Sequence, residues 1–209
     1  MAHHGYINFL QNRILNIASS GRTPAVLEIG VDRGVTLIPL VVAAASTDLQ
    51  KFLHVGVDIK IQESVRLTLH YLGPSVTVGT FLMEGNSLDV MPGLIDQNMT
   101  FDFILLDGDH NYHTVSQELK FIDKLLNPGG FIIIDDYDGK WSTRDLWYAD
   151  REGYEDNAHA TKPVPPGGLS GVKPAVDEWL LANPDWMLSK PIPEGEPVIL
   201  SRAAETNRT

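Results

Sequence analysis

The chain has 209 residues, of which 27 are acidic and 16 basic, giving a formal net charge of −11. This excess of negative charge argues against binding to nucleic acid or to an anionic membrane, because both need a basic surface. The sequence holds no cysteine, which excludes disulfides and thiolate metal sites. It shows neither a signal peptide nor an apolar run of transmembrane length, so we expect a single domain over residues 1–209 in the cytoplasm.

Helix and strand signals alternate along the first two thirds of the chain, as apolar residues recur with helical spacing or gather in short runs. The predicted order is helix 7–18, strand 25–29, helix 34–45, strand 53–57, helix 62–72, strand 80–83, helix 88–95, strand 101–106, helix 114–126 and strand 131–134. Thr114 and Gln117 have the spacing of a capping box, and the Asn-Pro-Gly-Gly run at 127–130 is predicted to end the last of these helices. This alternation predicts an α/β fold with a parallel sheet between helices.

The alternation ends after residue 134. Residues 137–171 are rich in proline, glycine, tryptophan and charge and lack periodicity. Long segments of this kind inside a domain are usually functional, so we predict a loop that covers the substrate. A helix over 172–182 and a strand pair over 186–190 and 197–201, joined by a turn at 193–195, complete the prediction.

Carboxylates follow the fourth and fifth predicted strands. The fourth strand runs into Asp107 and Asp109, and the fifth into Asp135 and Asp136. If the two strands are neighbours, these four side chains meet at one edge of the sheet. Crowded carboxylates repel one another, and such a cluster usually persists because it holds a cation or a charged ligand.

The first strand-to-helix turn indicates where a cofactor would bind. It carries Glu28, Gly30 and Gly34 with the spacing G-x-x-x-G, which differs from the G-x-G-x-x-G of dinucleotide sites. Asp32 lies between the two glycines and would repel a pyrophosphate, whereas a cationic ligand without phosphate is compatible with it. Open parallel sheets bind ligands beyond the carboxyl ends of their strands.

Polar residues also follow the second and third strands. Asp58 stands where an acid accepts hydrogen bonds from ribose hydroxyls, and Asn86 and Ser87 are placed to contact an adenine edge. The predicted cofactor-binding residues are Glu28, Gly30, Gly34, Asp58, Asn86, Ser87 and Asp107.

This ordered set resembles the class I S-adenosylmethionine-dependent methyltransferases. The resemblance rests on Val26-Leu27-Glu28-Ile29-Gly30 with Gly34, and on Val57-Asp58. It implies a Rossmann-like sheet of seven strands, mostly parallel with an antiparallel last strand, and helices on both faces. It also implies S-adenosyl-L-methionine as the cofactor.

More narrowly, the chain is similar to the macrocin and novobiocin type of sugar O-methyltransferases. The segments that carry this similarity are Asp107-Gly108-Asp109-His110-Asn111-Tyr112, Pro128-Gly129-Gly130, Asp135-Asp136 and residues 171–180. The similarity implies a Mg²⁺-dependent enzyme that methylates a hydroxyl of a small molecule. By motif position, Asp107, Asp135 and Asp136 would be the metal ligands and Asp109 the general base, with His110 as a rival base.

Other functions remain open at this point. The acids at the strand ends are also common where turns begin, and Asp109 could instead cap the following helix. A metal-independent methyltransferase, a nicotinamide-dependent oxidoreductase and a non-catalytic cofactor-binding module are the alternatives, because the same fold hosts many functions. A homo-oligomer is compatible with the resemblance.

Overall fold

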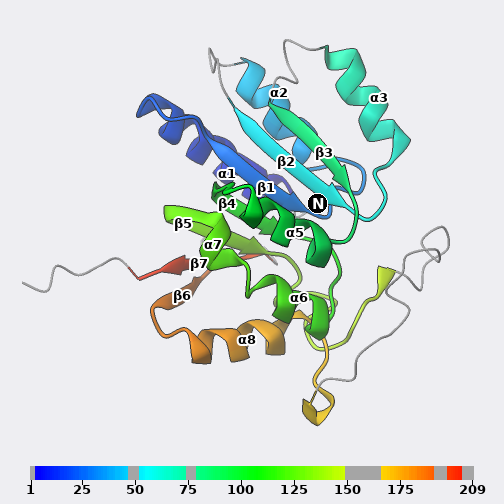
Figure 1. Cartoon of the computed structure of the whole chain (residues 1–209), viewed down its shortest axis with the longest axis vertical. Helices are drawn as coiled ribbons and strands as arrows, with labels where there is room; N and C mark the ends of the chain where they lie inside the picture. Colours follow the sequence, from blue (N-terminus) through cyan, green and yellow to red (C-terminus); the bar gives the residue numbers. More distant parts are fainter. Residues whose placement is uncertain (1–2, 47–51, 74–78, 149–165, 191–196, 204–209) are drawn as a thin grey trace, which may run out of the picture.

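The computed structural model describes residues 3–46, 52–73, 79–148, 166–190 and 197–203. Its centre is a seven-stranded sheet with the strand order β3-β2-β1-β4-β5-β7-β6 (Figure 1). The strands are β1 (Ala25–Ile29), β2 (Leu53–Asp58), β3 (Thr80–Glu84), β4 (Phe101–Leu106), β5 (Leu126–Ile134), β6 (Trp186–Ser189) and β7 (Val198–Arg202).

The number of strands and their directions match the sequence prediction. Strands β1 to β5 are parallel to one another, and β7 pairs antiparallel with both β5 and β6. The chain passes outward from β1 to β3 and then returns to β4 on the other side of β1, which makes the gap between β1 and β4 the topological switch point. Ligands of open α/β sheets bind beyond the carboxyl ends of the strands at this point.

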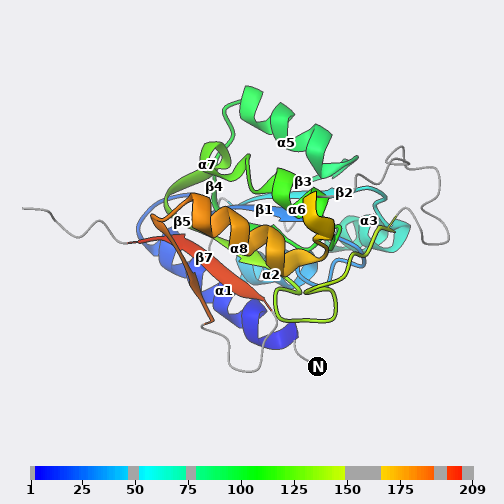
Figure 2. The same ribbon diagram turned by 90° about the horizontal axis from the view of Figure 1, so that it is seen from below.

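Helices cover both faces of the sheet (Figure 2). The helices are α1 (His3–Ser19), α2 (Leu37–Ser46), α3 (Glu63–Leu72), α5 (Ser87–Asp96), α6 (Tyr112–Glu118), α7 (Ile122–Leu125) and α8 (Val172–Ala182), with a short 3₁₀ turn at Pro166–Gly168. Helices α1, α2 and α3 pack on one face, and α5, α6, α7 and α8 on the other. None of the described helices has both the length and the apolar character needed to cross a membrane.

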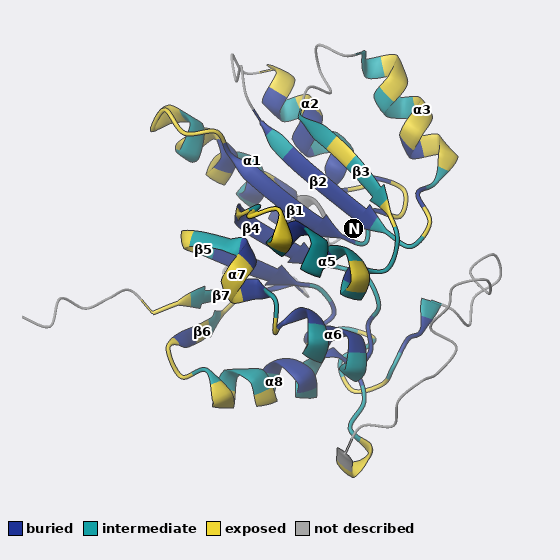
Figure 3. Ribbon diagram, in the orientation of Figure 1, coloured by how far each residue is buried: buried dark blue, intermediate teal, exposed yellow. Residues whose placement is uncertain are grey.

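Each central strand is buried on both faces, as a parallel sheet between helices requires (Figure 3). In β4, Ile104 and Leu106 point to the α5 side, whereas Phe103 and Leu105 point to the α1 side. All four are at most 3% exposed. This continuous apolar run is the reason that β4 was predictable from the sequence with its correct bounds.

The helix predicted over 114–126 is wrong in its extent. Helix α6 begins earlier, at Tyr112, with Asn111 as its N-cap, because the Asn111 side chain accepts from Thr114 N at 2.7 Å. Thr114 is therefore inside the helix and does not cap it. The helix ends at Glu118, and α7 follows after a turn. Both Leu119 and Ile122 are buried on either side of this break. Because both positions are apolar and have helical spacing, the sequence predicted one continuous helix.

Residues 127–130, predicted to end the preceding helix before a strand at 131–134, lie within β5. The strand starts at Leu126, opposite Phe101, and its register shifts before Phe103. Gly129 accommodates the irregularity with a φ of 76°. Of the predicted loop over 137–171, the structure describes 137–148 and 166–171, and the predicted turn at 193–195 lies outside the described residues.

Asp102, near the start of β4, anchors the end of the sheet remote from the switch point. It is 4% exposed and lies beside the guanidinium of Arg22. It accepts from Ala25 N at 2.9 Å and from Asn127 Nδ2 at 3.2 Å. One carboxylate thus ties the segment before β1 to β4 and β5.

We expect Asp102→Asn to lower the free energy of unfolding by about 2–3 kcal/mol, because an amide leaves buried donors without an acceptor. Chemical denaturation would measure the change. The matched control is Asp123→Asn, whose carboxylate forms an exposed pair with Arg202 at 2.9 Å and should cost about 1 kcal/mol or less. Equal effects of the two substitutions would contradict the anchoring role of Asp102.

Candidate active site

A cavity opens at the carboxyl ends of β1, β2 and β4, at the topological switch point. It encloses about 580 Å³ of space free of protein atoms, including the part that is open to solvent. Its wall consists of Ile29, Gly30, Asp32, Val57, Asp58, Ile59, Gly85, Asn86, Ser87, Asp107, Gly108, Asp109, Thr114 and Tyr148. Five of the seven predicted cofactor-binding residues are among them.

Gly30 forms the floor where β1 and β4 separate. Its φ is 90°, and a Cβ at this position would lie 1.9 Å from the carbonyl oxygen of Asp107. Gly30 N donates to Val57 O at 2.8 Å, and Asp107 N donates to Ile29 O at 2.8 Å. Only glycine allows the backbones of β1 and β4 to approach so closely here.

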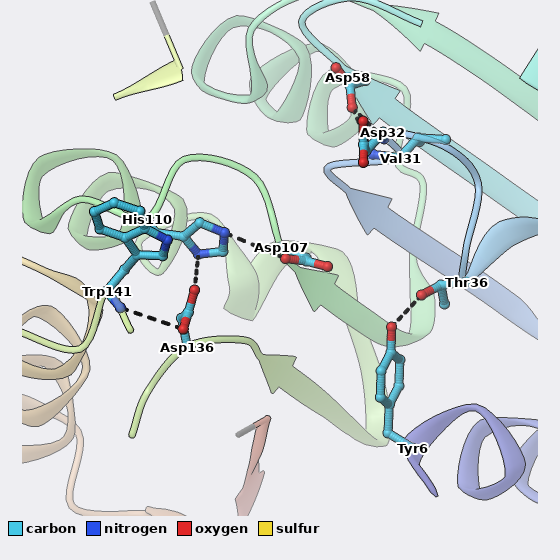
Figure 4. A network of polar contacts seen from close by, with 9 residues as sticks. All are labelled: Tyr6, Val31, Asp32, Thr36, Asp58, Asp107, His110, Asp136 and Trp141. Carbon is cyan, nitrogen blue, oxygen red and sulfur yellow. Dashed lines mark hydrogen bonds and ion pairs between the residues drawn. The ribbon is translucent and has the colours of Figure 1, made fainter. Parts of the chain in front are cut away.

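Asp58 fixes the turn that follows β1 (Figure 4). Its Oδ2 accepts from the backbone N–H groups of Val31 and Asp32, both at 2.8 Å, and its Oδ1 accepts from Lys60 N at 2.9 Å. Burial nevertheless raises the pKa of Asp58 above its usual value. Each carboxylate oxygen has two acceptor positions, and the second position of Oδ1 is left for a hydroxyl of a ligand in the cavity.

The opposite part of the wall is the start of α5. Asn86 is the N-cap, with Oδ1 accepting from Leu88 N at 2.8 Å, and Ser87 is the first residue of the helix. The Ser87 hydroxyl lies 2.6 Å from Oε1 of Glu118, which is 1% exposed. Glu118 was not predicted, although its position on the apolar face of α6, three residues after Val115, was a usable signal.

An acidic cluster adjoins the cavity at the ends of β4 and β5. Oxygen or nitrogen atoms of Asp107, His110 and Asp135 lie within 4.8 Å of one another. His110 Nε2 is 3.6 Å from Asp107 Oδ1 (Figure 4). Burial raises the pKa of Asp107 well above its usual value, and the neighbouring Asp135 raises it further. The ionised form of Asp107 is destabilised by burial and by the neighbouring carboxylate, and a bound cation would offset this cost.

The predicted metal triad of Asp107, Asp135 and Asp136 is only partly brought together, because His110 takes the third place. Asp136 has a φ of 57°. Its Oδ2 lies 3.8 Å from His110 Nδ1, and its Oδ1 accepts from Trp141 N at 3.5 Å (Figure 4). Asp136 therefore lies beside both His110 and the loop that follows β5.

The two predicted general bases differ in their access to the cavity. Asp109 lines it, whereas His110 is 6% exposed and does not. Asp109 Oδ1 accepts from Tyr148 N at 2.9 Å, and Oδ2 accepts from the Thr114 hydroxyl at 3.4 Å. Burial raises the pKa of Asp109 above its usual value. Asp109 thus has a fixed orientation, a raised proton affinity and contact with the cavity.

Two predicted cofactor-binding residues lie outside the cavity wall. Glu28 points to the opposite face of β1 from Ile29, as the period of a strand requires, and its Oε2 is 2.8 Å from His54 Nε2 in the core. Gly34 has a φ of 72° and shapes the turn before α2, where a Cβ would lie 2.8 Å from Ile38 Cδ1. Both residues support the site without forming its surface.

The N-terminal helix contributes a phenol close to the cluster, which the sequence did not indicate. Tyr6 in α1 is 4% exposed, and its hydroxyl is hydrogen-bonded to the hydroxyl of Thr36 (Figure 4). Burial raises the pKa of Tyr6, and the charges of Asp107 and Asp135 act in the same direction. Tyr6 therefore belongs to the electrostatic surroundings of the acidic cluster.

A family model described as a methyltransferase domain matches residues 27–137, more than half of the chain. The chain belongs to this methyltransferase family. The match runs from Leu27 in β1 to Tyr137 after β5 and so contains the cavity wall up to Thr114 and the whole acidic cluster. The prediction of a class I methyltransferase is confirmed, and the nicotinamide-dependent oxidoreductase is disfavoured.

Solved structures confirm the fold of the methyltransferase. The calicheamicin methyltransferase CalS11 superposes with a TM-score of 0.63 and 14% identity, over 96% of this chain and 78% of that one. The O-methyltransferase NovP gives 0.61 and 15% over 95% and 80%. TomG from Streptomyces achromogenes gives 0.57 and 17% over 93% and 79%. At these identities the likeness establishes the fold.

One curated relative shares a short segment with the methyltransferase. The uncharacterized protein R132 of Acanthamoeba polyphaga mimivirus is 39% identical over 56 residues. The alignment spans 26% of this chain and only 23% of the viral protein.

Proposed function

We propose that the protein transfers a methyl group from S-adenosylmethionine to a hydroxyl of a small molecule, with the help of a divalent cation. The observation that carries the proposal is the position of the cavity, which contacts the switch point on one side and the acidic cluster through Asp107 on the other. A cofactor pocket and an acidic site for the acceptor are thus directly adjacent.

The chemistry of the wall suits S-adenosylmethionine. Gly30 carries no side chain in the cavity wall, and a Cβ there would collide with the Asp107 carbonyl oxygen at 1.9 Å. Asp32, Asp58, Asp107 and Asp109 all line the cavity, and a concentration of carboxylates favours a cationic sulfonium over a pyrophosphate. Asp58 is placed to accept from ribose hydroxyls, with Asn86 and Ser87 at the adenine end. Among the solved relatives, TomG was crystallised in complex with SAM.

The donor set of the cluster suits a hard divalent cation through Asp107 and Asp135, because carboxylate oxygens are preferred ligands of Mg²⁺ and Mn²⁺. A bound cation would polarise the acceptor hydroxyl as a Lewis acid. The imidazole of His110 closes the third side of the cluster, with Nε2 3.6 Å from Asp107 Oδ1 and Nδ1 3.8 Å from Asp136 Oδ2.

Asp109 acts as the general base in this proposal. It removes the proton from the acceptor hydroxyl as the oxygen gains the methyl group and the sulfonium becomes the thioether of S-adenosylhomocysteine. The hydrogen bonds from Tyr148 N and Thr114 hold its carboxylate in one orientation. Its raised pKa brings Asp109 closer to the range in which a carboxylate is an effective general base near neutral pH.

A sugar hydroxyl is the acceptor to examine first. One solved relative is described as CalS11, a TDP-rhamnose 3'-O-methyltransferase. The direct test is transfer of labelled methyl from S-adenosylmethionine to a panel of nucleotide sugars and catechols, with Mg²⁺ or with chelator. Transfer that depends on added cation supports the proposal. Transfer that is unaffected by chelator would favour the metal-independent alternative, with Asp109 as its base.

Asp135→Asn separates stability from activity. We expect it to raise the melting temperature of the metal-stripped protein by roughly 2–4 °C, because it removes one of two repelling carboxylates. The same change should lower methyl transfer about a hundred-fold or more, because the cation loses a ligand. Calorimetry and the labelled-methyl assay measure the two effects. Asp123→Asn should leave methyl transfer unchanged and should not raise the melting temperature, and a loss of stability in Asp135→Asn without loss of activity would contradict the cation site.

A further inference from the structure

Helix α6 presents two polar side chains on its buried face, one turn apart. Thr114 is 6% exposed and Glu118 is 1% exposed. Thr114 Oγ1 lies 3.4 Å from Asp109 Oδ2, and Glu118 Oε1 lies 2.6 Å from Ser87 Oγ. Both partners line the cavity. Helix α6 therefore braces two parts of the cavity wall that come from different segments of the chain.

The surroundings of Glu118 favour the neutral acid. Burial raises the pKa of Glu118 from 4.5 to about 8 against the opposing effect of the Ser87 hydrogen bond, and the Asp109 carboxylate adds to the rise. Within the described part of the chain, no ion pair joins Glu118 to a cation, and its hydrogen-bond partner is Ser87. The charged residues of the adjacent helices α5 and α8 are Asp89, Asp96, Lys173, Asp177 and Glu178. A neutral acid at physiological pH has one O–H to donate.

The protonation state of Glu118 decides what Ser87 can offer to a ligand. When Glu118 is neutral, its O–H can donate to Ser87 Oγ, and the Ser87 O–H is then available to the cavity. When Glu118 is ionised, it accepts a hydrogen bond from the Ser87 hydroxyl. The Ser87 oxygen then presents only its lone pairs to the ligand. Ser87 thus changes from a donor to an acceptor as Glu118 loses its proton.

We propose that Glu118 is a positioning residue of the cofactor site: as a neutral acid it donates to Ser87, so that the Ser87 hydroxyl donates to an acceptor nitrogen of the adenine ring. This inference rests on the proposed function, because it takes S-adenosylmethionine as the ligand. The sign of its pH dependence follows from the raised pKa. The neutral form prevails below about pH 8 and is lost above it, so cofactor affinity should fall as the pH rises through this value.

The test is calorimetric titration of the full chain with S-adenosylhomocysteine at about pH 6.5 and about pH 9.5, on either side of the Glu118 pKa. We expect the native Kd to rise about tenfold at the higher pH, the loss of one hydrogen bond. Glu118→Gln keeps a donor toward Ser87 at both pH values. It should bind like the native protein at the lower pH and lack the additional tenfold loss. Ser87→Ala should bind about tenfold more weakly at both.

Each outcome has a defined meaning, provided that circular dichroism shows the variants to be folded. If native protein and Glu118→Gln share the same pH dependence, the role of Glu118 is overturned while the proposed function stands. If Ser87→Ala binds as tightly as native protein, the inference is likewise overturned. If native protein does not bind at either pH, the proposed function fails and this inference with it. Glu118→Ala, expected to bind about tenfold more weakly at the lower pH, completes the comparison because Glu118→Gln should rescue it.

Discussion

Replacing Asp109 with asparagine should lower kcat for methyl transfer about a thousand-fold, within the usual contribution of a general base. The amide has nearly the same shape and can still accept from Tyr148 N, but it has no affinity for the hydroxyl proton. Affinity for S-adenosylhomocysteine should stay within about threefold, because only one wall group changes. Steady-state kinetics with saturating cofactor would separate these two effects.

Asp138→Asn is the matched control for Asp109→Asn. Asp138 is also an aspartate near the end of a strand, but its carboxylate is exposed and pairs with Lys190 and Lys173. We expect its kcat to be unchanged within about twofold, because exposed pairs contribute little. An Asp109→Asn enzyme that retains most of its kcat would eliminate Asp109 as the base and transfer that role to His110.

Replacing Gly30 with alanine should abolish detectable cofactor binding and destabilise the fold by roughly 3 kcal/mol or more. The added Cβ would lie 1.9 Å from the Asp107 carbonyl oxygen, and the backbone has a φ of 90°. Relief of this clash requires β1 and β4 to separate where they meet at the cavity floor. Denaturant unfolding and titration with S-adenosylhomocysteine would measure both consequences.

Gly73→Ala distinguishes this steric clash from the general cost of a positive φ. Gly73 has a φ of 81°, but among the residues that the structure describes no atom lies within 4 Å of the position that its Cβ would take. Its ψ is 162°, a conformation almost restricted to glycine, so its replacement should cost about 1–3 kcal/mol and leave cofactor binding unchanged. Equal losses in the two variants would mean that the close approach of β1 to β4 does not shape the cavity.

Much of the fold was readable from the sequence because the central strands are apolar on both faces. The bounds of β1, β4 and α8 were predicted as observed, since burial required mostly apolar residues in the two strands, interrupted only by Glu28 in β1 and by Asp102 in β4, and apolar residues with helical spacing in α8. The helix prediction was wrong between α6 and α7, where apolar side chains remain buried although the helix is interrupted. Leu119 and Ile122 are buried across the break between α6 and α7, so their spacing carried no information about the break.

The candidate site shows the same division. Strand-end position placed Gly30, Asp58 and Asp107 in the cavity wall, because strand ends at a switch point converge whatever the details. Side-chain direction was less predictable. Glu28 points into the opposite core by strand alternation, and the Asp136 carboxylate lies beside His110 and Trp141. The hydrogen bond between Ser87 and Glu118 joins residues that are 31 positions apart. The only sign of it in the sequence was a carboxylate among the apolar residues of a predicted helix face.

The most direct test of the account is a calorimetric titration of metal-stripped protein with S-adenosylmethionine, with NAD in a parallel experiment. The acidic cavity predicts binding of S-adenosylmethionine with a Kd of roughly micromolar order, and no binding of NAD, whose pyrophosphate would face Asp32 and Asp58. Binding of NAD alone, or of neither compound by protein shown to be folded, would contradict the assignment of this cavity to a methyl donor.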